Sequence, residues 1–112
     1  MTEGIREIEV SIELLKKKVR KAELLERLEN NADFKEFIME GFCKEHALGL
    51  IAKKASPSFQ DEKNKFYMDG QLSAIGNLQL YMQFTRQEGE IAKQAIFDSE
   101  VEKERLIEEG AM

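Results

Sequence analysis

Cys43 and His46 are the only cysteine and histidine in the chain, and a step of three would place both on one face of a helix. The two side chains can ligate zinc, but a structural zinc site takes four ligands, so carboxylates or a second subunit would have to complete it. They can also act as nucleophile and base, but that chemistry needs an orienting third group and an oxyanion pocket. Neither has a local signature. The sequence favours a small buried thiol beside a half-exposed imidazole.

No other motif predicts catalysis. The run from Gly70 to Gly76 lies in a stretch with helical periodicity, without the strand that precedes a phosphate-binding glycine loop. Paired acids such as Glu108 and Glu109 are typical of solvated helix faces. We therefore expect a protein that is not an enzyme, with no catalytic, cofactor-binding or metal site.

The composition favours one helical domain. A chain of 112 residues fits one hydrophobic core, and its 42% hydrophobic and 35% charged residues, with a single proline, suit exposed helices. One cysteine excludes an intrachain disulfide, and the N-terminus shows no apolar secretion signal, so a reducing cytoplasm is the expected location. The longest apolar run is far shorter than the roughly 20 residues of a membrane helix, so no membrane contact is expected.

The net charge of −5 arises near the C-terminus, because residues 86–112 carry eight acids and four bases while the remainder is almost balanced. This acidic excess disfavours binding to nucleic acid, which requires clustered basic residues, so we do not expect such binding. The one basic cluster is predicted on the outer faces of the first helix. Its pairing with the acidic residues 88–109 is favoured over contact with nucleic acid or an acidic partner. The cluster consists of Lys16, Lys17, Lys18, Arg20 and Lys21.

Apolar residues recur in the first helix at alternating steps of three and four, which is the spacing of a coiled-coil seam. Such a seam needs a matching helix, either from another copy, from a larger partner, or from the third helix of the same chain. Beyond it the strict register falls on Glu26, whereas the apolar residues move to Leu24, Leu25 and Leu28, so the covering surface must change there. The predicted interaction seam comprises Ile5, Ile8, Ile12, Leu15, Val19 and Ala22.

Two breaks divide the chain into three predicted helices. The first helix covers residues 2–29 and ends at Asn30 and Asn31, which tolerate the geometry of a helix end. The second covers 34–55, with a kink near Gly41 or Gly49, and ends before Pro57. The third covers 58–109, either continuous or broken near Gly76 or Gly89. The expected fold is a single all-α domain over 1–112, a helical hairpin or bundle with coiled-coil-like packing.

The junction of the first two helices resembles a pattern found in small, mostly uncharacterised helical proteins of tailed bacteriophages, and the likeness covers roughly residues 5–90. The residues that carry it are Leu24, Leu25, Glu26, Arg27, Leu28, Asn31, Asp33, Phe34, Lys35, Ile38, Glu40, Gly41, Phe42, Glu45 and Ala47. The resemblance implies a virion-associated or assembly protein that binds other chains. It implies no active-site residues.

Two functions are therefore expected as alternatives. The first is a structural or assembly protein that works through helix–helix contacts, as a homo-oligomer or with a larger virion or host protein, in the host cytoplasm or within a virion. The second is a phage-encoded regulator or inhibitor of host machinery, or a nucleic-acid-associated factor. That alternative would use the basic cluster at 16–21 or the acidic C-terminal helix.

Overall fold

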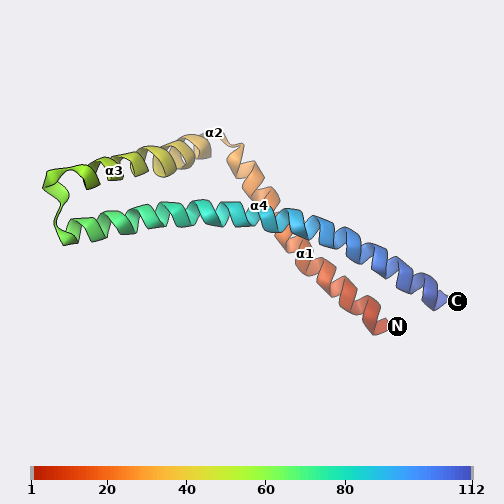
Figure 1. Ribbon diagram of the computed structural model, residues 1–112. Coiled ribbons are helices and arrows are strands. Elements are labelled where there is room, and N and C mark those ends of the chain that lie inside the picture. The colour runs from red at the N-terminus through yellow and green to blue at the C-terminus, as the bar shows by residue number, and fades with distance from the viewer. Residues whose placement is uncertain (1, 112) are drawn as a thin grey trace. The chain divides into compact units, whose positions relative to one another are not determined.

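The computed structural model describes residues 2–111, with the side chains of residues 3–110, and every regular element in this range is a helix. In the order of the chain, a long helix is followed by a central helical segment and then by a second long helix (Figure 1). This confirms the predicted all-α fold. The elements are α1 (Thr2–Glu29), α2 (Ala32–Phe34), the π-helix η1 (Lys35–His46), α3 (Ala47–Ala55), the 3-10 helix η2 (Pro57–Phe59) and α4 (Glu62–Ala111).

Short polar side chains set the ends of these helices. After α1, the side-chain oxygen of Asn31 accepts a hydrogen bond from the backbone N–H of Phe34, at 2.9 Å, and so caps α2. The sequence assigned residues 34–55 to one helix, but the structure divides them into a π-helical segment and α3. The last helix begins at Glu62 rather than at residue 58, because Pro57 opens a separate 3-10 turn.

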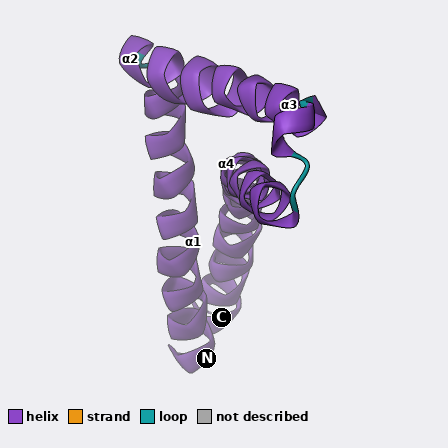
Figure 2. Ribbon diagram, turned by 90° about the vertical axis from the view of Figure 1, so that its left-hand side faces the viewer, coloured by secondary structure: helices purple, strands orange, loops and turns teal. Residues whose placement is uncertain are grey.

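The connection between α3 and α4 is held by side chains that bind the exposed end of α3. The amide nitrogen of Gln60 donates to the carbonyl oxygens of Lys54 and Ser56, at 2.7 and 2.8 Å. These carbonyls lie in the last turn, where a helix cannot satisfy them internally. Lys54 also pairs with Asp69 of α4, at 2.6 Å. The connection, drawn in teal in Figure 2, thus returns the chain along α4 in the opposite direction.

The helix α4 is continuous over 50 residues, which corresponds to a length of about 75 Å. It passes through Gly76 and Gly89 without interruption, so neither residue breaks it. The structure divides into two compact units, and α4 contributes to both. Unit 1 combines α1 up to Leu25 with α4 from Phe84 onward, and unit 2 comprises Glu26–Gln83.

Unit 1 is an antiparallel pair of helices, with the chain ends at the same end of the pair (Figure 1). An ion pair of 3.0 Å joins Glu9 of α1 to Lys103 of α4. The two helices approach closely at Gly89, which is buried; a Cβ atom placed there would lie 2.3 Å from the Cβ atom of Ala22. Only a residue without a side chain allows the backbones to come this close.

Unit 2 has its own hydrophobic core, in which the π-helix and α3 pack against the first part of α4. Its buried members come from all three elements and are Cys43, Leu50, Met68 and Ile75. Half-buried apolar side chains surround them, namely Ile38, Phe42, Ala47, Phe59, Leu72 and Leu78. The dense aromatic second segment therefore forms part of a core, and this core positions the π-helix.

Asp61 caps α4, and we expect its removal to destabilise unit 2. Its carboxylate accepts hydrogen bonds from the backbone N–H and the side-chain amide of Asn64, at 3.1 and 2.6 Å. The substitution Asp61→Ala removes both bonds and should lower the midpoint of thermal unfolding by a few degrees, measured by circular dichroism. Asp61→Asn, which retains an accepting oxygen, should lower this midpoint less.

The same cap predicts a dependence on pH. Hydrogen bonds from the Asn64 side chain and backbone lower the pKa of Asp61 in the folded protein. The stability that Asp61 contributes is therefore present above its unfolded pKa and is lost as the pH falls through its folded pKa. Since Asp61→Asn cannot titrate, the difference in stability between this variant and the natural chain should shrink on acidification. A difference that is independent of pH would contradict this role.

Candidate protein-interaction surface

The π-helix places residues five apart on the same face, and this geometry creates the candidate site. In a π-helix the backbone bonds run from i to i+5, and runs as long as Lys35–His46 are rare. Gly41 lies at its middle, where an added Cβ atom would come within 3.2 Å of the carbonyl oxygen of Glu36, five residues earlier. A side chain at position 41 would crowd this turn, so glycine suits it.

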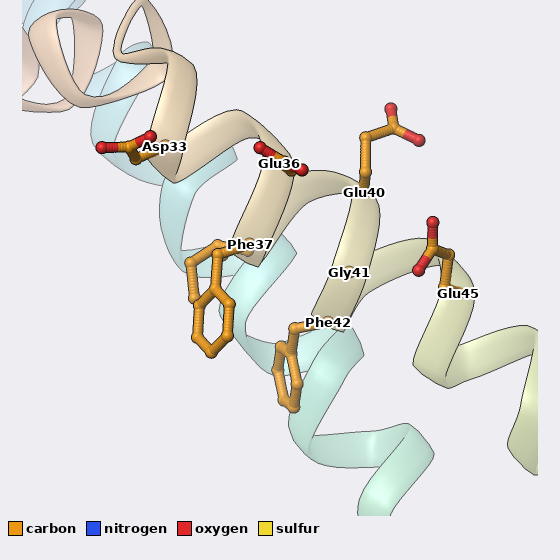
Figure 3. A pocket seen from close by; sticks show the side chains of 8 residues that line it. Asp33, Glu36, Phe37, Glu40, Gly41, Phe42 and Glu45 are labelled. Atoms are coloured by element: carbon orange, nitrogen blue, oxygen red, sulfur yellow. The ribbon is translucent and has the colours of Figure 1, made fainter.

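An open groove of about 690 Å³ follows this segment. The rings of Phe37 and Phe42 point to the same side of the helix, and the carboxylates of Glu40 and Glu45 point away from them (Figure 3). Phe37 is 77% exposed, whereas Phe42 is half-buried. The groove is lined by Asp33, Glu36, Phe37, Ile38, Glu40, Gly41, Phe42 and Glu45.

Phe42 is held by contacts on both sides. It packs against the core of unit 2, and its ring stacks on the imidazole of His46, with centroids 5.7 Å apart and planes inclined by 15°. Phe37 is exposed beside it, so an apolar ligand entering the groove would find one fixed ring and one ring open to solvent. Burying the second ring would be favourable by the ordinary hydrophobic effect.

The charge of the groove is acidic. Four carboxylates line it, and one of them, that of Glu40, pairs with Lys44 at 3.7 Å. Cations bind both to carboxylates and to the faces of aromatic rings. An open groove on a helix surface buries less of a small molecule than the enclosed pockets that usually hold such ligands. The geometry therefore suits a basic, amphipathic helix of a protein partner better than a small metabolite.

The structure places the predicted seam against the same chain. Its six residues, Ile5, Ile8, Ile12, Leu15, Val19 and Ala22, are all buried or half-buried in unit 1. Contacts at both ends, from Gly4 to Leu106 and from Ala22 to Gly89, show that α4 covers this face. The helix that covers the seam in the structure is thus the chain's own last helix, one of the three partners considered.

The basic cluster remains on the surface. Lys16, Lys17, Lys18, Arg20 and Lys21 are all exposed on α1. Lys16 pairs with Glu13 of its own helix, at 3.4 Å. An ion pair that joins the two helices of unit 1 has the opposite polarity to the predicted pairing, because α1 supplies Glu9 and α4 supplies Lys103. In the C-terminal part of α4, Arg105 binds Glu102 and Glu109, so acids there have partners in their own helix.

Cys43 and His46 are separated by their surroundings. Cys43 belongs to the core of unit 2, where burial raises the pKa of its thiol, and His46 is exposed and stacked on Phe42. A raised pKa disfavours the reactive thiolate. Among the residues that the structure describes, no three of the types His, Cys, Asp and Glu converge as a metal site would require.

From the sequence, the aromatic residues Phe37 and Phe42 can belong either to the core or to a groove for a partner, and core is favoured. That preference assumes helical steps of three and four, under which positions 37 and 42 do not share a face. The structure shows a step of five between the half-buried Ile38 and the buried Cys43, as a π-helical segment produces. The signal that the sequence alone offered is Gly41, which predicts a kink within this segment.

Comparisons with known proteins add no relative: no family model, curated protein or solved structure matches the chain. In the part of the chain that the structure describes, none of the helices combines the length and the apolar character needed to cross a bilayer.

Proposed function

We propose that this chain is a non-enzymatic assembly protein that acts by binding other helices. The observation that carries the proposal is the amount of apolar surface left in contact with solvent. Among the described side chains, sixteen large hydrophobic residues are exposed, against eight hydrophobic residues that are buried. Single exposed apolar side chains are normal on a soluble protein, but exposed groups of them are characteristic of binding surfaces.

The exposed residues fall in groups that a partner can cover. Val10 and Leu14 are one turn apart on α1, and so are Leu24 and Leu28. The group with the best defined surroundings is the acidic groove of the π-helix, with Phe37 as its exposed aromatic residue. We propose that this groove binds a helix that carries lysine or arginine on one face and an apolar anchor between the charges.

Assembly of a virion is the setting that the resemblance to helical phage proteins favours. A protein that contributes to such a structure needs binding surfaces rather than a reaction centre, and its partner would be another virion or host chain. The support for this setting is the pattern at residues 24–47; the exposed apolar groups support helix binding independently of it.

The proposal is tested with two matched variants, Phe37→Ser and Phe66→Ser. Both replace an exposed phenyl ring of unit 2, with exposed fractions of 77% and 84%, but only Phe37 lines the groove. The probe is a synthetic amphipathic helical peptide with lysines on one face and leucines on the other, followed by fluorescence anisotropy. Phe37→Ser should weaken binding about tenfold or more, since a buried aromatic ring contributes roughly 1.5 to 3 kcal/mol. Phe66→Ser should leave it unchanged.

The native partner is sought with the same pair of variants. The natural chain and Phe66→Ser should each retain a binding partner from the source cell, and Phe37→Ser should lose it. Binding of the peptide should also weaken with added salt, because carboxylates contribute to it. If the peptide does not bind the natural chain, or if the two variants lose it equally, the groove is not the binding surface.

A further inference from the structure

A second stripe on α1 lies opposite the face that α4 covers, and its charges are arranged in a regular order. Its positions follow one another at steps of four and three, so they share one helical face. All six are exposed, and Val10 and Leu14, at the centre, are each 57% exposed. We call it the outer stripe; it consists of Glu3, Glu7, Val10, Leu14, Lys17 and Lys21.

The outer stripe is complementary to itself when it is read in reverse. Acids occupy its first two positions, apolar residues the middle two, and bases the last two. If a second copy of α1 lies antiparallel on the stripe, with the two-fold axis near position 12, Val10 of one copy faces Leu14 of the other. Glu7 then faces Lys17, and Glu3 faces Lys21. Every position on the stripe meets its complement.

We propose that a second copy of this chain docks antiparallel on the outer stripe and forms a symmetric dimer. The inference rests on the proposed assembly function and names a second copy as one of its partners. The parallel arrangement is disfavoured, because it would bring Glu7 against Glu7 and Lys17 against Lys17. Shallow grooves of about 340 and 290 Å³ adjoin Val10 and Leu14, and in the dimer each receives the apolar side chain of the other copy.

The dimer is expected to be weak and dependent on concentration. Exposed ion pairs contribute little individually, and their main effect is to select the orientation, while Val10 and Leu14 supply the apolar contact. The same register carries one unfavourable pair at its edge, because Arg6 comes near Lys18 of the second copy. Both of these residues are exposed.

Charge reversal tests the pairing directly. We expect Glu7→Lys and Lys17→Glu each to raise the dissociation constant of the dimer about tenfold, because two symmetric pairs become repulsive together. The double variant, Glu7→Lys with Lys17→Glu, should return it close to that of the natural chain. Sedimentation velocity of the full chain over a wide concentration range at low salt measures all four proteins. Circular dichroism checks that each keeps its helical content.

Arg6→Glu should change the dissociation constant of the dimer in the opposite direction. By replacing the unfavourable edge pair with an attractive one, it should tighten the dimer several-fold. A natural chain that stays monomeric at every concentration overturns the inference, and so does an unchanged dissociation constant for Glu7→Lys, which a parallel dimer would show. If the chain is monomeric but still binds the lysine–leucine peptide through Phe37, the dimer is wrong and the proposed function stands. If the chain is monomeric and does not bind the peptide, both proposals are wrong.

Discussion

The substitution Ile12→Asp should unfold unit 1. Ile12 lies in the middle of the seam and is only 6% exposed, so an aspartate there would bury a carboxylate. The cations nearby, Lys16 and Lys103, already pair with Glu13 and Glu9. The charge loses its hydration and the isoleucine loses its apolar contacts with α4. An unpaired buried charge costs roughly 3 to 5 kcal/mol, which is a large part of the stability of a domain of this size. Urea unfolding followed by circular dichroism measures the loss.

Ser11→Asp is the matched control for this experiment. It introduces the same side chain one position earlier in α1, where the structure places the residue in solvent. Its stability should stay within about 0.5 kcal/mol of the natural chain when measured at low protein concentration. If Ile12→Asp were equally harmless, the seam would not face α4, and the described antiparallel pair would be wrong.

Gly89→Ala should destabilise unit 1, although alanine is the better helix former. The new methyl group would lie 2.3 Å from the Cβ atom of Ala22, so the two helices would have to separate or shift. Overpacking of this kind costs about 1 to 3 kcal/mol, against a gain in helix propensity of at most about 1 kcal/mol. Thermal unfolding would record a lower midpoint.

Two further variants isolate the contact as the cause. Gly70 lies in the same helix with no atom within 4 Å of an added Cβ, so Gly70→Ala should raise the midpoint. Combining Gly89→Ala with Ala22→Gly removes the methyl group that the new side chain would meet, and it should recover much of the contact energy. A Gly89→Ala protein that is more stable than the natural chain would show that the close approach does not occur.

Local patterns in the sequence were sufficient to find the long helices and the two breaks, although the second predicted helix is divided and α4 begins at Glu62 rather than at residue 58. Alternating apolar steps identified the face of α1 that contains Ile12, and Asn31 and Pro57 marked the two breaks. The sequence did not identify the helix that covers this face, because an apolar seam predicts that a face is covered and not which helix covers it. Gly89 was considered as a break in α4, yet it serves to bring two helices close together.

The candidate groove depended on features that helical periodicity does not encode. A single extra residue per turn, as in the π-helix, changes which side chains are neighbours. Phe37 and Phe42 therefore share a side although an α-helix would separate them, and Gly41 lies between them. The sequence predicts one domain over 1–112, and the structure groups its residues into two compact units that share α1 and α4. Both unit boundaries fall inside continuous helices, where composition shows no linker.

The continuity of α4 means that neither unit can exist as an excised fragment with natural ends. The border near residue 25 lies within α1, and the border near residue 83 lies within α4. A single cut in the connection at residues 56–60 would leave an amino-terminal and a carboxy-terminal fragment. Each fragment would contain part of unit 1 and part of unit 2. The two fragments are therefore expected to bind each other and to regain their structure only in the complex, as the fragments of a split protein do.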